Sequence, residues 1–195
     1  MTNGIVLKGV VAASTFAYVK EQHGSAAWQA CLDRLGDADR IAVTAGGNVP
    51  LSAMGRFNEE FVEVVCGGSR IRAQEEFRHM GAVSAEKLLT GGGIFSIFAR
   101  FVTPKAVLSR AESVMKSAYP GITVAVQIDA DESGGVITMS DMSGYSYGSQ
   151  RVVGWLLRGI EIVGGRNARV SEKNWDAGKN DSREYVITMH WEGWR

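Results

Sequence analysis

The chain has 195 residues, of which 45% are hydrophobic and 22% are charged, and its 21 basic residues balance its 21 acidic ones. A chain without net charge has no long-range attraction for nucleic acid or anionic lipid, which argues against a DNA-binding role and leaves open only a local basic patch. Cys31 and Cys66, the only cysteines, form no CxxC motif and favour a reducing compartment. With neither a signal-peptide pattern nor a run of about 18 apolar residues, we expect a cytoplasmic protein without a membrane span.

Residues 1–120 have the apolar spacing of helices. A first helix is expected over residues 10–22, with Gly24 as its stop, and Ser25 can cap a second helix over residues 26–35. A third helix is expected to begin after Asn48-Val49-Pro50 and to end at Gly67-Gly68, because apolar residues recur there every three or four positions.

Two further helices are expected before residue 120, and residues 94–102 are apolar enough for a short buried helix between them. Ser69 can cap the first of the two, and the triplet Gly91-Gly92-Gly93 interrupts it. Thr103-Pro104 places a cap before a proline at the first helical position and opens the second, which runs to residue 118. The predicted inner faces are Ala73, Phe77, Met80, Ser84 and Leu88 on the first, and Val107, Leu108, Ala111, Val114 and Met115 on the second.

Beyond residue 121 the apolar residues alternate, as in strands with one buried face. One hairpin is expected over residues 122–128 and 136–142, and a second over residues 169–175 and 183–191. Residues 149–163, between the hairpins, have helical spacing. The sequence therefore predicts one α+β domain over residues 1–195, whose helical N-terminal two-thirds packs on a four-stranded antiparallel sheet with one crossing helix.

The predicted crossing helix contains two glycines, Gly154 and Gly159, on either side of Trp155 and its neighbours. Each interior glycine costs a helix about 1 kcal/mol relative to alanine. We interpret both as packing glycines that let the helix backbone approach a neighbour, with Trp155 filling the space beside them. A cleft opened for a ligand is the other interpretation.

Three groups of segments resemble known proteins: residues 9–11 and 16–24 with 28–35, residues 77–84, and residues 152–163 with 165, 168–170 and 184–185. They are similar to the first helices, the middle helix, and the closing helix and hairpin of a family of uncharacterised proteins of about this length, abundant in myxobacteria. That family looks like a branch of the fold shared by haem–nitric-oxide-binding domains, vinyl-four-reductase domains and Bet-three-like subunits of vesicle-tethering complexes. The resemblance implies an α+β domain, often dimeric, able to enclose a small hydrophobic ligand between helices and sheet.

The resemblance to vinyl-four-reductase domains does not extend to a zinc site. Those relatives often carry zinc-binding cysteines that flank the last hairpin turn. The matching places here lie near Trp175 and Ser182, and neither residue is a thiolate. Because a soft-ligand zinc site needs Cys or His at about four positions, no metal site is predicted.

The resemblance also implies haem as the alternative cofactor. Haem–nitric-oxide-binding domains use a proximal histidine and a Tyr-x-Ser-x-Arg motif against the haem propionates. Tyr147-x-Ser149-x-Arg151 fits that pattern at the start of the predicted crossing helix. His79 is the candidate axial ligand, although acidic residues three and four positions before it can equally hold it at the surface. These four residues are candidate cofactor ligands only if haem binds.

No motif of nucleophilic or metal catalysis is present. Gly-x-Ser-x-Gly is missing, the three histidines have no metal-binding spacing, and the glycine triplet lacks the Lys-Ser/Thr of a phosphate loop. Asp129, Asp131 and Glu132 fall on the first predicted hairpin turn, where a weak cation site stays open. A non-enzymatic role is therefore expected.

Aromatic and sulfur-containing side chains gather where the predicted helices face the sheet. Such residues line adaptable apolar pockets, and they also form ordinary cores. The candidate ligand-binding residues are Phe77, Met80, Phe95, Phe98 and Trp155.

Our leading hypothesis is a non-enzymatic cytoplasmic sensor or adaptor that binds a small hydrophobic ligand or a protein partner, without a cofactor and as a homodimer. The alternative is a haem-dependent gas sensor, and a third hypothesis is an enzyme that acts on a hydrophobic or tetrapyrrole substrate. The dimer contact is expected over residues 10–35, because Phe16, Tyr18 and Trp28 lie on faces that one small domain can hardly bury.

Overall fold

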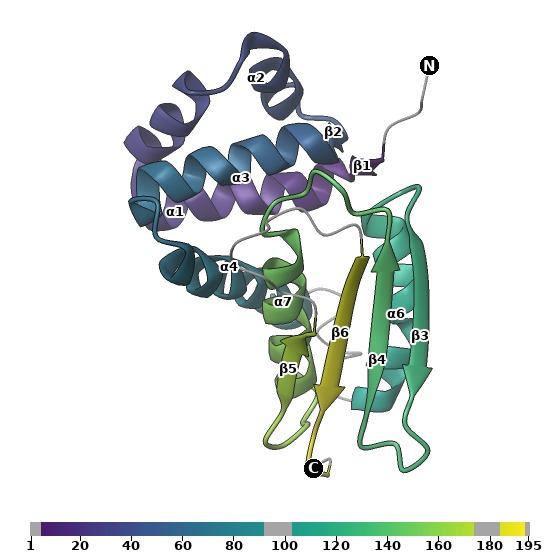
Figure 1. Ribbon diagram of the computed structural model, residues 1–195. Coiled ribbons are helices and arrows are strands. Elements are labelled where there is room, and N and C mark those ends of the chain that lie inside the picture. The colour runs from purple at the N-terminus through teal and green to yellow at the C-terminus, as the bar shows by residue number, and fades with distance from the viewer. Residues whose placement is uncertain (1–4, 92–102, 174–183, 194–195) are drawn as a thin grey trace.

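The computed structural model describes residues 5–91, 103–173 and 184–193 (Figure 1). Within them the chain has an α+β fold, with a four-stranded antiparallel sheet ordered β3-β4-β6-β5 and a two-stranded sheet of β1 and β2. The predicted fold class and four-stranded sheet are confirmed. The helices are α1 (Gly9–Asp33), α2 (Asp37–Thr44), α3 (Leu51–Cys66), α4 (Arg70–Thr90), α6 (Pro104–Ala118) and α7 (Gly148–Ile162). The strands are β1 (Val6–Leu7), β2 (Val49–Pro50), β3 (Thr123–Ile128), β4 (Gly134–Ser140), β5 (Arg169–Glu172) and β6 (Glu184–His190).

Most predicted helix boundaries are confirmed by their caps. Gly24 has φ 83° and ψ 165°, so it separates α1 into two helical arms that match the two predicted first helices. The Ser69 hydroxyl accepts from the Arg72 N–H, and the Thr103 hydroxyl accepts from the Ala106 N–H before Pro104. The short helix α2 and the two-residue strands β1 and β2 were not predicted, because segments this short carry little periodic signal.

The sheet and its helices form two layers. In Figure 1, α6 lies behind β3 and β4, and α7 lies behind β5 and beside β6. Side chains alternate along the strands, and those facing the helices are buried, as predicted for one-sided strands. This core face contains Val124, Ile137, Met139, Tyr185, Ile187 and Met189. α1, α2 and α3 lie together at the other end of the molecule, and α4 runs from them to α7 (Figure 1).

Two residues of the predicted inner faces are exposed. Phe77 and Met80 of α4, and Met115 of α6, are buried as expected. Leu88 and Val114, by contrast, are 46% and 43% exposed, so their prediction as core residues is wrong. They lie where α4 and α6 stand apart, at the cavity described below.

The crossing of α7 over α4 confirms one packing glycine and corrects the other. A Cβ on Gly154 would overlap the Arg78 carbonyl oxygen and lie 2.6 Å from its carbon. A Cβ on Gly159 would meet nothing closer than 3.8 Å, which is ordinary contact. Gly159 is therefore not needed for close packing, and α7 makes its main contact with α4 rather than with the sheet.

The predicted dimer face is partly internal. Tyr18 is buried, and its hydroxyl donates to Glu76 of α4 at 3.0 Å. Phe16 and Trp28 are half-buried, and both pack against Phe57 of α3. These rings contribute to the core of one chain, which explains them without a partner.

The remaining predictions fall on other parts of the chain. The helix over residues 94–102, the second hairpin turn, and Phe95, Phe98, Trp175 and Ser182 lie outside the described residues. None of the helices in the described ranges combines the length and apolar content needed to cross a membrane.

Candidate ligand-binding site

A cavity of about 410 Å³ opens between α1, α4, α6 and α7. Most of its described lining is apolar, and Arg151 of α7 contributes a cationic side chain to its wall. The described residues that line it are Val10, Val11, Ser14, Ser84, Lys87, Leu88, Val114, Met115, Ala118, Tyr119, Arg151, Val152 and Trp155.

Exposure separates the rim of this cavity from its floor. Val10 is 77% exposed, and Leu88 and Val114 are a little under half exposed, so these apolar side chains form the rim. Arg151 and Tyr119, in contrast, are only 6% and 3% exposed and lie at the floor. The cavity therefore has two buried polar side chains beside the buried apolar Met115 and Val152, and exposed apolar side chains at its mouth.

Arg151 is held at the floor by uncharged groups. Its Nη2 donates to the Ser14 hydroxyl at 2.6 Å, to the Val11 carbonyl at 3.3 Å and to the Ser84 hydroxyl at 3.4 Å. Its Nε is buried and has no hydrogen-bond partner among the described residues. No carboxylate of the described ranges forms an ion pair with it.

Two tyrosines complete the polar floor. The rings of Tyr119 and Tyr145 lie 5.9 Å apart, and the Tyr119 hydroxyl neighbours Arg151. Burial raises the pKa of Tyr119 well above its ordinary range, and Tyr145 adds to this while Arg151 opposes it. The Tyr145 hydroxyl is buried beside the Tyr119 hydroxyl, and a hydrogen bond between the two side chains contributes to the raised pKa of Tyr119. The Tyr119 phenol is therefore protonated and can donate.

The start of α7 is positioned by the loop over residues 141–147. A Cβ on Gly55 of α3 would lie 2.9 Å from the Gly144 carbonyl carbon, so helix and loop backbones touch. Asn58 of α3 donates to the Ser146 carbonyl at 2.7 Å, and Tyr185 of β6 donates to the Tyr145 carbonyl at 2.8 Å. These bonds orient the first turn of α7 and hence Arg151.

The side chains of the Tyr-x-Ser-x-Arg pattern diverge in the structure. Tyr147 stacks on Phe77, with ring centroids 5.0 Å apart and planes at 11°. Ser149 is buried and hydrogen-bonds the Glu172 carboxylate of β5. Only Arg151 reaches the cavity. The three side chains do not converge on one site.

A buried polar cluster beside the pattern was not predicted. The Gln150 amide donates to Glu172 at 3.0 Å, and its oxygen accepts from Arg78 at 2.8 Å and from Gln74 at 3.3 Å. Burial raises the pKa of Glu172 and lowers the pKa of Arg78. The only sequence signal was a glutamine on the apolar face of the predicted crossing helix.

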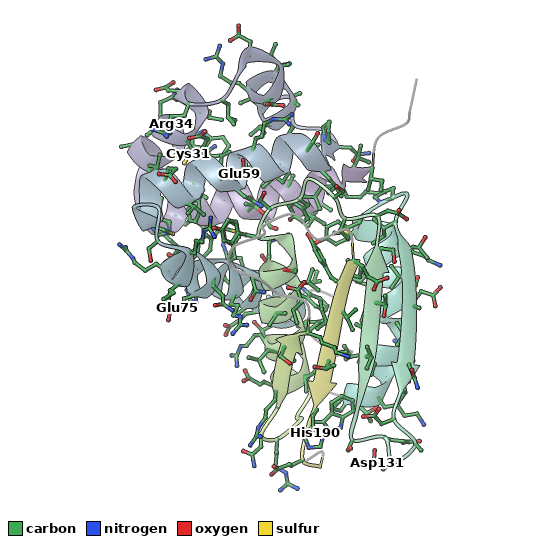
Figure 2. The ribbon with its side chains drawn as sticks, viewed as in Figure 1. Cys31, Arg34, Glu59, Glu75, Asp131 and His190 are labelled. Atoms are coloured by element: carbon green, nitrogen blue, oxygen red, sulfur yellow. The ribbon has the colours of Figure 1, made fainter. Side chains whose placement is uncertain are left out.

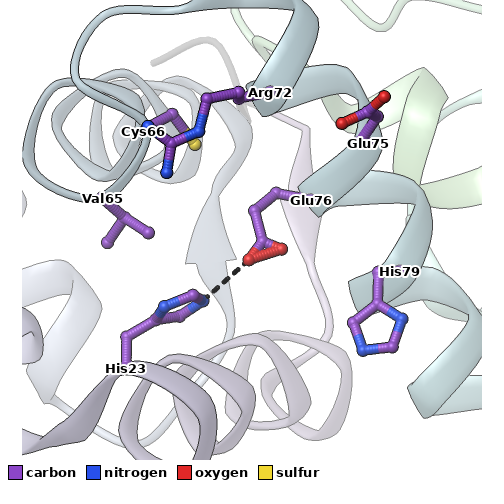
Figure 3. Close-up of a pocket in the computed structure, with 7 residues that line it drawn as sticks. All are labelled: His23, Val65, Cys66, Arg72, Glu75, Glu76 and His79. Carbon is purple, nitrogen blue, oxygen red and sulfur yellow. Dashed lines mark ion pairs between the residues drawn. The ribbon is translucent and has the colours of Figure 1, made fainter.

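His79 lies at a second, more polar cavity of about 370 Å³ (Figure 3). His23 pairs there with Glu76 at 3.0 Å, and Figure 3 shows both histidines projecting beside Glu76. His79 is exposed, as expected for a surface histidine, and it does not line the cavity that contains Arg151. The two halves of the predicted haem site are therefore in different cavities.

Other titratable groups are spread over the molecule. Figure 2 places His190 and Asp131 at the far end of the sheet, and Cys31 among the helices at the other end. Glu132 pairs with Lys105, and Asp131 accepts from Ser133, whose N–H lowers the pKa of the Asp131 carboxyl. Within the described ranges, no group of three His, Cys, Asp or Glu side chains is arranged to hold a metal ion.

The predicted ligand-binding residues occupy different places. Trp155 lines the cavity. Phe77 and Met80 are buried in the core instead, where Phe77 packs between Phe61 and Tyr147. The sequence interpretation missed Ser14, Ser84 and Tyr119, and no spacing rule joins them, because they come from three separate elements.

Solved structures that match nearly the whole chain include H-NOX proteins. An Fe(II) unliganded H-NOX protein from K. algicida matches with a TM-score of 0.70 and 11% identity, over 96% of this chain and 97% of that chain. An H-NOX protein from S. oneidensis in the Fe(II)NO ligation state has a TM-score of 0.64 and 12% identity, over 96% and 100% of the two chains. An I5F mutant of the T. Tengcongensis H-NOX protein has a TM-score of 0.66 and 13% identity, over 96% and 99%.

No protein-family model matches the chain, and no curated protein matches it in sequence. At identities of 11–13% the structural likeness shows the fold alone. The chain has an H-NOX-like fold, which confirms the resemblance to haem–nitric-oxide-binding domains.

Proposed function

We propose that this chain is a non-enzymatic sensor domain that binds a small, mostly apolar molecule in the cavity between α1, α4, α6 and α7. The observation that carries the proposal is the exposed apolar rim of Val10, Leu88 and Val114 around a cavity with a buried floor. Large apolar side chains at a concave surface are typical of ligand sites. A cavity of about 410 Å³ lies in the size range of small-molecule pockets.

Haem is the second candidate ligand. The H-NOX neighbours are described by their Fe(II) and Fe(II)NO states and by heme distortion, so the fold likeness supports haem more directly than an unspecified apolar ligand. The Tyr147-x-Ser149-x-Arg151 pattern adds to this, since its arginine reaches the cavity.

The residues around the cavity do not fit a histidine-ligated haem. Haem iron in proteins is held by His, Cys, Met or Tyr. All three histidines of the sequence belong to the described residues, and none lines this cavity. Both cysteines are buried elsewhere, in α1 and at the end of α3. Of the donors that remain in the described lining, Met115 is a weak ligand, and the raised pKa of Tyr119 opposes a phenolate. We therefore propose that the sensed molecule is not haem.

The test uses a neutral fluorescent probe, N-phenyl-1-naphthylamine, and a pair of tryptophan substitutions on α6. Ala118 lines the cavity and Ser117 beside it is exposed and does not. We expect the probe to bind the wild-type chain and the Ser117→Trp variant, and Ala118→Trp to abolish binding by filling the cavity. Equal binding by all three folded proteins would contradict the proposal.

A haem titration distinguishes the two candidates. We expect no Soret band typical of histidine ligation, and no difference between the wild-type chain and His79→Ala. A band that appears in the wild-type chain and is lost in His79→Ala would overturn the proposal in favour of haem.

Assembly as a homodimer and a role as a protein adaptor remain predictions. The half-buried rings of Phe16 and Trp28 support the core, so charged substitutions there would also unfold the chain. Val10 is the better place to test association, because it is 77% exposed at the start of α1. We expect a dimer mass by light scattering that Val10→Glu reduces.

A further inference from the structure

We infer that the edge strand β3 pairs with β3 of a second copy of this chain, so that the sheet continues across a two-fold axis. The inference goes beyond the proposed function, because no residue of β3 lines the ligand cavity and the pairing does not depend on what the cavity binds. It follows from the backbone groups on the free side of β3, from its side chains, and from a comparison with the opposite edge of the sheet.

The backbone of β3 is hydrogen-bonded on one side and free on the other. β3 is the outermost strand in the order β3-β4-β6-β5 and lies at the right edge of the sheet in Figure 1. The Asp129 N–H donates to the Gly134 carbonyl at 3.1 Å, so the backbone groups of every second residue back from Asp129 point at β4. The N–H and C=O groups of Val124, Val126 and Ile128 therefore point away from the sheet. Within the described ranges, no backbone group pairs with them.

The two edges of the sheet differ in how they are protected. Natural proteins blunt free edges with charged side chains, proline, bulges or very short strands. β5 follows this rule, because it has four residues and both Arg169 and Glu172, at its ends, are charged. β3 does not follow it: its six residues carry no charge and no proline, and they pair with β4 in unbroken register. The contrast indicates that another strand covers β3.

The side chains of β3 allow the covering strand to be a second copy. In an antiparallel two-fold pair centred on Val126, Val124 forms a hydrogen-bonded pair with Ile128 of the second copy. Ala125, which is exposed, then faces Gln127 of the second copy in a non-hydrogen-bonded pair, where side chains come closer. A two-fold axis repeats every charge, so a charged strand would meet its like, and β3 has no charge. The whole chain also has no net charge that would repel a second copy at long range.

The experiment is residue-resolved amide hydrogen exchange of the full, isotope-labelled chain by NMR, at low and at high protein concentration. We expect the amides of Val124, Val126 and Ile128 to exchange about tenfold or more slowly at high concentration, because pairing protects them. The amides of Ala125 and Gln127 point at β4 and are the internal reference, whose exchange should not depend on concentration.

Charges introduced on the exposed face of β3 test the pairing directly. Ala125→Lys should remove the concentration-dependent protection, because the two introduced lysines lie near each other across the axis. Adding Gln127→Glu to the same chain should restore it, because each introduced glutamate then faces the lysine of the other copy. Ser171→Lys, at an exposed position of the β5 edge, is the matched control and should behave as wild type.

Three results would overturn the inference and leave the proposed ligand binding untouched. Equally fast exchange of the outward amides at both concentrations would show that nothing covers β3. Slow exchange at both concentrations, unchanged in Ala125→Lys, would show that the same chain covers it. Loss of protection in Val10→Glu or Ser171→Lys, as in Ala125→Lys, would show that the protection comes from association elsewhere. If Ala125→Lys does not fold, the concentration dependence of the wild-type amides still decides the inference.

Discussion

Gly81 of α4 lies directly against the backbone of Arg151 in α7. A Cβ at Gly81 would overlap the Arg151 carbonyl oxygen and lie 2.7 Å from the Trp155 N–H nitrogen. Gly154 makes the reciprocal approach to Arg78 of α4. These two glycines bring the helices close enough to bury the guanidinium of Arg151 at the floor of the cavity.

Alanine substitutions at this crossing should be destabilising. Gly81→Ala and Gly154→Ala each place a methyl group into backbone of the facing helix, so the helices must separate. We expect each to lower the free energy of unfolding by about 1–3 kcal/mol, measured by urea denaturation. Gly159→Ala is the control: its methyl group fits, and it should raise stability by about 1 kcal/mol through helix propensity. Equal effects at all three positions would show that the close approach is not what these glycines provide.

Glu172 should make stability fall as pH rises. Burial raises the folded-state pKa of its carboxyl above the ordinary value of 4.5, so the folded chain holds the proton more tightly than the unfolded chain. The stabilising contribution is complete below pH 4.5 and is lost as pH rises through the folded-state pKa. Glu172→Gln keeps an acceptor for Gln150 and removes the titration.

The measurement for Glu172 is the difference in unfolding free energy between wild type and variant across pH. We expect Glu172→Gln to gain stability relative to wild type as pH rises above 4.5. Glu112→Gln, at an exposed carboxylate of α6, is the matched control. A difference that is flat with pH would contradict a buried carboxyl at this position.

Both cysteines should be slow to react in the folded chain. Burial raises the pKa of Cys31 and of Cys66 to about 11, and the Glu60 and Glu76 carboxylates, respectively, add to this. The thiolate is the reactive form, so little of it is present at mildly alkaline pH. We expect a disulfide reagent such as dithionitrobenzoate to modify neither thiol rapidly in native protein, and to modify both at once after denaturation. Rapid native labelling of either thiol would contradict its burial.

Asn58 should couple the stability of the fold to the position of α7. Its side chain donates to the Ser146 carbonyl, two residues before α7 begins. Asn58→Ala leaves that carbonyl without the bond in a buried place, which should cost about 1–3 kcal/mol of unfolding free energy. We also expect weaker binding of the neutral fluorescent probe, measured by titration. Ser52→Ala, at an exposed position of the same helix, should change neither quantity.

The helix ends could be predicted because their causes are local. Ser69 and Thr103 cap helices through backbone groups three residues away, and Gly24 and Gly67 have positive φ that few other residues adopt. The alternation along β3, β4 and β6 likewise follows from one buried face. The same periodicity misplaced two residues: Leu88 and Val114 have the spacing of core residues, yet no helix of the described ranges covers them at the rim of the cavity.

The sequence by itself determined the α+β class, the order of the longer helices and strands of the described ranges, and the close packing at Gly154, since propensity, capping and periodicity act over a few residues. Only the tertiary structure decided which tyrosine, serines and arginine meet: Ser14, Ser84, Tyr119 and Arg151 are far apart in sequence. In the tertiary structure, His79 and Arg151 also line two different cavities. The physical reason is that the way in which helices cross determines which side chains meet at a binding site. Here α4 and α7 cross where their backbones can touch, at Gly81 and Gly154.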